Sequence, residues 1–158
     1  GTGAHPSTRL CLQLLQETIR GGEKVYDIGT GSGILAISGA LLGAGRVIAV
    51  DIDPVAVGVA RENVRRNGVE TKVTVEQGDL LTGLPAGADL IVANIIAEVI
   101  MKITPWVNHL LNSRGVFISS GIIDSKASRV RETLVEAGFL IEKELTEDGW
   151  VAFLARRG

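Results

Sequence analysis

The sequence predicts an α/β protein with a doubly wound, mostly parallel sheet and one antiparallel strand near the sheet's edge. Short apolar segments typical of buried strands alternate with segments of helical periodicity. A glycine-rich loop joins the first of these strands to the helix that follows it. The last two β-rich segments are separated by turn residues at 147–149, which predict a hairpin and therefore an antiparallel pair.

The composition is that of one globular domain, which we expect to cover residues 1–158. The formal net charge of −2 excludes a general electrostatic affinity for nucleic acid or membranes. A single cysteine, Cys11, excludes an internal disulfide and fits a reducing compartment. Residues 28–45 carry no charge, but their repeated glycines favour a turn and a buried helix over a membrane span. No signal-peptide pattern is visible, so we expect a cytoplasmic protein.

The first predicted helix begins near Pro6, which fits a first helical turn, and is ended by Gly21-Gly22. Its inward face is formed, at helical spacing, by Leu10, Cys11, Leu14, Leu15 and Thr18. Two interpretations of Ser7 and Thr8 are open. Their side chains either cap the first turn, which stabilises it by about 1 kcal/mol, or meet the carboxylate of a ligand together with the free helix N–H groups.

A strand at 24–28 leads through Gly29, Gly31 and Gly33 into a helix at 33–43. Glycines at alternate positions let the backbone turn sharply and approach a ligand closely, because glycine adopts positive φ without a steric penalty. The helix aims its free N–H groups and the positive end of its dipole into the loop. An anionic group can bind there.

A second strand at 46–50 ends in Asp51, whose carboxylate can accept hydrogen bonds from ribose hydroxyls. The loop and this acid together predict a nucleoside-bearing cofactor. The G-x-G-x-G spacing is one residue shorter than the dinucleotide fingerprint. Asp27, just before the loop, would repel a pyrophosphate but suits an ammonium or sulfonium group. We therefore predict S-adenosylmethionine, with a dinucleotide and a purely structural glycine turn as the alternatives.

Asp53 and Pro54 predict the N-cap and first residue of a helix that ends near Asn67. The spacing of Asp51 and Asp53 resembles a metal-binding pair. Both residues have other roles, however, and no third ligand is nearby in the sequence, so we predict no metal site.

Two further polar residues follow strands on the side where open α/β sheets bind ligands. Asp79 comes after a strand at 72–77, where it either accepts a hydrogen bond from an adenine amino group or is a simple turn residue. The apolar central strand at 88–96 includes Asn94, beside the glycine loop. Asn94 either contacts the ligand or caps a buried helix.

The remaining elements are predicted from periodicity and turn residues. Pro105 is expected to kink or split the helix at 96–112. A strand at 116–120, a helix at about 125–137 and the β-rich segment 139–157 complete the chain.

With these residues in view, the chain resembles the catalytic domain of ribosomal protein methyltransferases of the PrmA type, which are class I S-adenosylmethionine-dependent enzymes. The lead-in segment and the V-A-N-I segment are specific to that family, whereas the glycine loop is common to the whole class. The resemblance covers most of the chain, in residues 1–8, 27–37, 50–54, 67–69, 92–97 and 120–122.

The resemblance implies a Rossmann-like methyltransferase fold of about seven strands, with the last strand but one at the edge. It implies cofactor contacts at Thr8, Gly29, Asp51 and Asn94. The substrate it implies is a large-subunit ribosomal protein of the stalk base, methylated on lysine side chains, on the N-terminal amine, or on both.

Two departures from the family pattern are visible. Family members carry a separate N-terminal domain that recruits the ribosomal protein, and this chain starts without one. We therefore expect a fragment that binds cofactor but finds its substrate poorly. Glu98-Val99 stands where the family often has Gly-Pro, which is expected to alter the substrate edge.

Methyl transfer to an amine requires a neutral acceptor, and no residue is an obvious general base. We predict that Asn94 is catalytic by positioning, because its amide oxygen can accept the amine's hydrogens and direct its lone pair. Asn-Ile-Ile replaces the N-P-P-aromatic motif of many amino-group methyltransferases. A methyltransferase acting on RNA or a small molecule, and a cofactor-binding module without catalysis, are the alternatives.

Overall fold

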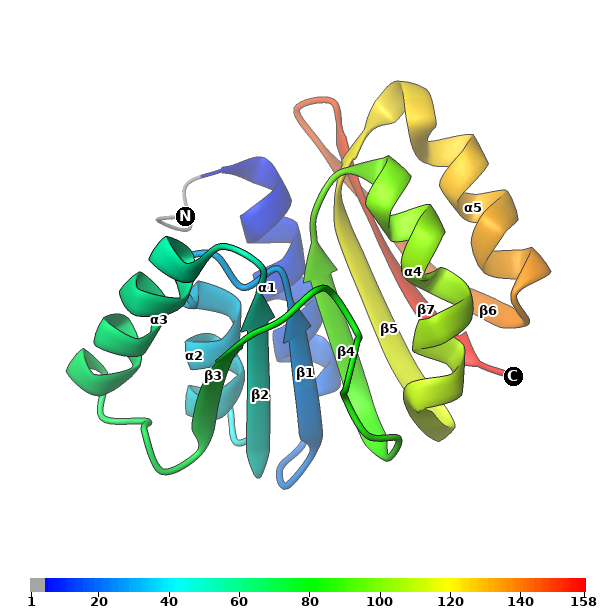
Figure 1. Ribbon diagram of the computed structural model, residues 1–158. Helices are drawn as coiled ribbons and strands as arrows, with labels where there is room; N and C mark the ends of the chain where they lie inside the picture. The colour runs from blue at the N-terminus through cyan, green and yellow to red at the C-terminus, as the bar shows by residue number, and fades with distance from the viewer. Residues whose placement is uncertain (1–4) are drawn as a thin grey trace.

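A seven-stranded sheet forms the centre of the molecule (Figure 1). The computed structural model describes residues 5–158. The strand order is β3-β2-β1-β4-β5-β7-β6, and every neighbouring pair is parallel except those formed by β7, which runs antiparallel to β5 and β6. The predicted fold class is confirmed, including the one antiparallel strand near the edge. β6, the last strand but one in the chain, lies at the edge as the family resemblance implied.

Strands and helices alternate along most of the chain. The strands are β1 (Lys24–Ile28), β2 (Arg46–Asp51), β3 (Val73–Gln77), β4 (Ala88–Asn94), β5 (Leu111–Ile123), β6 (Phe139–Glu147) and β7 (Trp150–Arg157). The helices are α1 (Pro6–Thr18), α2 (Ile34–Leu41), α3 (Pro54–Arg66), α4 (Ala97–Leu110), the 3₁₀ turn η1 (Asp124–Lys126) and α5 (Ala127–Glu136). No helix among residues 5–158 is long and apolar enough to cross a membrane.

Helices cover both faces of the sheet, so the molecule has two apolar cores. Helices α1, α2 and α3 share one core, and α4 and α5 share the other (Figure 1). The neighbouring β4 residues Ile91 and Val92 are both fully buried but belong to different cores. This follows from the two-residue period of a strand, which turns successive side chains to opposite faces.

The C-terminal hairpin forms at the predicted turn. Asp148 and Gly149 adopt φ values of 50° and 82°, as the two central residues of a type I′ turn require. The turn lets β7 return along β6 and then pair with β5.

Helix α4 runs unbroken through Pro105, so a split there is wrong, whereas a kink stays a prediction. The missing proline N–H removes only one backbone hydrogen bond. On its inner face the helix buries Ile100, Ile103 and Val107, and the Thr104 hydroxyl donates to the Ile100 carbonyl at 2.7 Å. This tertiary packing outweighs the local cost of the proline.

Strand β5 is longer than predicted, because it begins directly after α4. A register shift separates its pairing at Leu111 from its pairing at Val116, and Arg114 between them has a φ of 65°. The extra residues therefore form an irregular first part of the strand.

The connection from β3 to β4, residues 78–87, contains no helix. It passes across the sheet on the side of α4 (Figure 1). Leu80, Leu81 and Leu84 pack against the core on this side, and the Tyr26 hydroxyl donates to the Pro85 carbonyl at 2.5 Å.

Candidate active site

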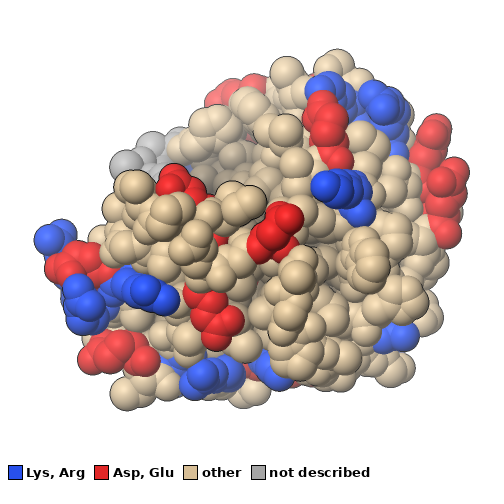
Figure 2. All heavy atoms as spheres, viewed as in Figure 1, with Lys and Arg blue, Asp and Glu red and all other residues tan. Residues whose placement is uncertain are grey.

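The carboxyl ends of the parallel strands meet at one edge of the sheet. β1 and β4 are neighbours, but the helices that follow them cover opposite faces, which makes this the topological switch point where α/β sheets bind ligands. In the space-filling view the surface is hollowed at this edge, between α3 and α4 (Figure 2). The candidate site is built here.

The three loop glycines are required for different reasons. All have positive φ, at 72°, 57° and 88° for Gly29, Gly31 and Gly33. A Cβ atom at Gly29 would lie 2.7 Å from the side chain of Ile95, and one at Gly33 would lie 3.3 Å from the Cβ of Ala60. Gly31 has no atom within 4 Å of such a position, so the loop faces open space there.

Asp51 links the glycine loop to the end of β2 by hydrogen bonding. Its Oδ2 accepts the N–H of Gly31 at 2.9 Å, and its Oδ1 accepts the N–H of Asp53 at 3.0 Å. Each carboxylate oxygen can accept a second hydrogen bond. The side chain can thus hold the loop and still accept from ligand hydroxyls. The predicted cap is also present, since Asp53 Oδ1 accepts the N–H of Val55 at 2.9 Å.

Asp27 lies beneath the loop, with only 1% of its surface exposed. Its Oδ2 accepts the Thr30 hydroxyl at 2.7 Å, whereas its Oδ1 has no hydrogen-bond partner. Burial raises the pKa of Asp27 to about 6, and the Thr30 hydrogen bond opposes this rise by favouring the ionised form. The structure therefore provides a buried carboxylate with an unsatisfied oxygen next to the predicted cofactor loop.

Asn94 ends β4 at the same edge and contacts the first turn of α1. Its Nδ2 donates to the Thr8 hydroxyl oxygen at 3.3 Å. A Cβ atom at Gly121 would lie 2.9 Å from Asn94 Oδ1 and 2.6 Å from the Ile95 carbonyl oxygen. Only glycine leaves room for the amide oxygen there.

A model of one protein family matches the whole chain, residues 1–158, and its description is "Ribosomal protein L11 methyltransferase (PrmA)". The chain belongs to the PrmA family. The ribosomal protein L11 methyltransferase of Anoxybacillus flavithermus is 52% identical over 157 residues, which is 99% of this chain and 50% of that protein. The chain thus spans about half the length of the curated relatives it matches.

Solved structures agree with membership of the PrmA family. The ribosomal protein L11 methylase of Lactobacillus delbrueckii has a TM-score of 0.92 and 33% identity, with 96% of this chain and 79% of that chain covered. An RNA methyltransferase of Salinibacter ruber, solved with S-adenosyl-L-homocysteine, has a TM-score of 0.75 and 21% identity over 96% of this chain and 93% of that chain. At that identity the second likeness shows the fold alone.

Two features of this PrmA-family site were not predicted from the sequence. The N-cap of α1 is His5, whose Nδ1 accepts the N–H of Ser7 at 3.1 Å, so capping of the first turn by Ser7 or Thr8 is wrong. Both residues are instead buried. Ser120 is the second feature, because its hydroxyl donates to the Ser7 carbonyl at 2.9 Å. Its position at the end of the predicted strand 116–120, directly before a glycine, is the signal that could have identified it.

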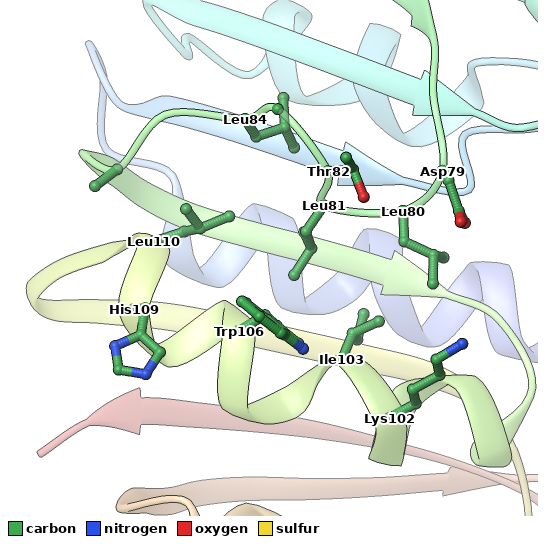
Figure 3. A pocket seen from close by; sticks show the side chains of 12 residues that line it. Asp79, Leu80, Leu81, Thr82, Leu84, Lys102, Ile103, Trp106, His109 and Leu110 are labelled. Atoms are coloured by element: carbon green, nitrogen blue, oxygen red, sulfur yellow. The ribbon is translucent and has the colours of Figure 1, made fainter.

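Asp79 lies at one end of a hollow of about 720 Å³ between the 78–87 loop and α4 (Figure 3). Leu81 and Trp106 face each other across this hollow. The Gly78 N–H donates to the Asp51 carbonyl at 3.0 Å, which fixes the start of the loop beside β2. The contact of the Asp79 carboxylate with adenine stays a prediction. Among residues 5–158 no group of three potential metal ligands gathers.

Proposed function

We propose that this chain transfers methyl groups from S-adenosylmethionine to amino groups of ribosomal protein L11, on lysine side chains, the N-terminal amine, or both. Family membership supports the activity, and the names of its relatives support the substrate. The observation that carries the proposal is the meeting of Asn94, the glycine loop and Asp51 at the switch point of the sheet. We propose that the chain acts in the cytoplasm, without direct nucleic-acid or membrane binding.

The residues at this edge fit S-adenosylmethionine. The open space at Gly31 accommodates a ligand, and Asp51 retains acceptor capacity for ribose hydroxyls. Ile52 is 64% exposed beside Asp51 and offers an apolar surface to a base. The buried negative charge of Asp27 beneath the loop suits a cationic ligand that needs no phosphate site. When bound, S-adenosylmethionine supplies a methyl group made electrophilic by its sulfonium.

The first turn of α1 fits the amino acid end of the cofactor. The N–H groups of Ser7 and Thr8 are already bonded to His5, so the free N–H groups expected there are absent. The Thr8 hydroxyl accepts from Asn94 and can donate its own hydrogen to a carboxylate. We infer that this turn and the glycine loop together enclose the amino acid end, while Asp51 holds the ribose.

Asn94 is positioned to orient the acceptor amine. Its Nδ2 is directed to Thr8, so its Oδ1 can accept a hydrogen of the amine. A lysine amine with the usual pKa of about 10.4 is mostly protonated at pH 7, and deprotonation costs about 4–5 kcal/mol. In the mechanism we propose, the site contributes positioning and electrostatic stabilisation and needs no general base.

The test incubates this chain with methyl-labelled S-adenosylmethionine and either purified large-subunit ribosomal proteins or ribosomal RNA. We expect label in L11 and none in RNA. Label in RNA would instead assign the chain to the nucleic-acid alternative. If the chain binds S-adenosylmethionine but labels no acceptor, even as part of the full-length protein, it is a cofactor-binding module and the proposed activity is wrong.

A further inference from the structure

Ser120 connects the two segments that carry Thr8 and Asn94. It is completely buried in β5, at the position where the pairing of β5 with β4 ends. Its hydroxyl donates to the Ser7 carbonyl at 2.9 Å, across 113 positions of sequence. Its own carbonyl accepts the N–H of Ile95 at 3.1 Å. Ser120 therefore forms hydrogen bonds with both the first turn of α1 and the segment that follows Asn94.

The Thr8–Asn94 contact depends on how closely α1 approaches the sheet. At 3.3 Å it is already long for an N–H···O hydrogen bond, so a small outward shift of α1 would break it. The first turn also makes contacts with the β6–β7 hairpin. Arg9 pairs with Glu147, and the His5 ring packs against Trp150 with centroids 4.8 Å apart. Both of these tie the turn to the β6–β7 hairpin, whereas Ser120 ties it to the site.

The neighbouring residue Ser119 shows that a buried hydroxyl in this strand need not have this role. Ser119 is also completely buried, but its Oγ has no hydrogen-bond partner. Because successive side chains of a strand point to opposite faces, Ser119 is turned away from α1. The chain thus offers two adjacent, equally buried serines, of which one contacts the first turn of α1.

We propose that Ser120 is a positioning residue whose hydroxyl holds the first turn of α1 against the cofactor's carboxylate and holds Thr8 against Asn94. This inference rests on the proposed function, because it takes the amino acid end of S-adenosylmethionine as the group that faces the turn. Ser120 acts through Ser7 and Thr8 and does not itself touch the cofactor.

The surroundings of Ser120 support a role in hydrogen bonding without a change of charge. Ser120 interacts with the titratable side chain of Cys11 on α1. Burial raises the pKa of the Cys11 thiol to about 12, so the thiol is neutral at physiological pH. The thiol therefore adds no charge beside the Ser120–Ser7 hydrogen bond at physiological pH.

The experiment measures binding by calorimetry with two probes that differ only in the carboxylate. The probes are S-adenosylhomocysteine and its decarboxylated analogue S-adenosyl-3-thiopropylamine. In Ser120→Ala we expect S-adenosylhomocysteine to bind about tenfold more weakly, the change expected for one lost buried hydrogen bond. The analogue should bind Ser120→Ala and the wild type equally, because it lacks the group that faces the turn. Ser119→Ala should bind both probes as the wild type does.

The two-probe design separates positioning from a general structural role. If Ser120→Ala weakens both probes equally, or behaves like Ser119→Ala, the inference is wrong while the proposed cofactor remains. If the wild-type chain binds neither probe, the proposed function itself fails. Should Ser120→Ala not fold, the near-isosteric Ser120→Cys, a weaker hydrogen-bond donor, replaces it and must show the same loss confined to S-adenosylhomocysteine.

Discussion

At the scale of single residues, the candidate site relies on side chains whose polar atoms are only partly used by the fold. Asp51 employs one lone pair of each oxygen, Asn94 employs its Nδ2, and Asp27 leaves Oδ1 unpartnered. Polar atoms with spare hydrogen-bonding capacity, gathered at one edge of the sheet, are typical of a binding site. Each of these residues was predicted from the sequence because motif spacing placed it at a strand end.

Replacing Asn94 with alanine should lower kcat by about 10²–10³-fold, the loss typical of a preorganised hydrogen-bonding group. The fold should persist, because the side chain makes only one long hydrogen bond to Thr8. Steady-state methylation of L11 by the full-length enzyme measures the effect. Asn112→Ala is the matched control, since this exposed amide donates to the Gly87 carbonyl at the opposite edge of the sheet. Equal activity of the Asn94 and Asn112 variants would contradict the positioning role.

Replacing Asp27 with asparagine should stabilise the ligand-free protein at pH 7. The folded-state pKa of Asp27, about 6, lies above the reference value of 3.8. The neutral acid is therefore favoured in the folded state, and stability is lost as pH rises from about 4 to about 6. A shift of this size corresponds to about 3 kcal/mol.

Urea unfolding of the wild type and Asp27→Asn over this pH range isolates the Asp27 contribution as the difference between the two proteins. That difference should be near its minimum at pH 4 and should reach its plateau above pH 6. A difference that does not change with pH would show that Asp27 has an ordinary pKa. The same variant should bind S-adenosylmethionine more weakly, because the carboxylate that suits its cationic groups is gone.

At the scale of elements, local sequence signals predicted the five α-helices and seven strands of residues 5–158 but not the 3₁₀ turn η1, and tertiary packing decided the ends of the elements. The cap at Asp53 and the turn at Asp148-Gly149 are local, so both were predictable. The beginning of β5 was not, because its pairing partner Ala88 is distant in sequence. The continuity of α4 was not predictable either, because the stabilisation from burying its inner face outweighs the local cost of Pro105.

Replacing Pro105 tests directly how much this proline destabilises helix α4. Pro105→Ala restores a backbone donor in the helix interior and should raise stability by about 1–2 kcal/mol, less than the full cost of an interior proline because the unfolded chain also becomes more flexible. Pro54→Ala is the control, since Pro54 occupies the first position of α3, where proline is well tolerated. It should be neutral or slightly destabilising in the same urea titration. If both variants lose stability, Pro105 is accommodated without strain.

At the scale of the whole molecule, the topology brings together residues that the sequence keeps far apart. Thr8, Asn94 and Ser120 come from α1, β4 and β5, and their contacts span 86 and 113 positions. Strand-end residues could be expected to share an edge, since parallel carboxyl ends meet there. The approach of α1 to that edge was one of two interpretations that the spacing left open, and the family resemblance favoured it.

All residues proposed to hold the cofactor lie within this chain, although it spans about half of its relatives' length. S-adenosylhomocysteine should therefore bind this chain and the full-length protein with affinities within about threefold of each other. Methylation of L11 should differ, because a docking surface outside this chain would contribute to substrate binding. We expect a higher KM for L11 with this chain and a similar kcat at saturation. A short lysine peptide, which uses only the active site, should be methylated equally by both. A large loss of cofactor affinity in this chain would show that the rest of the protein completes the cofactor site.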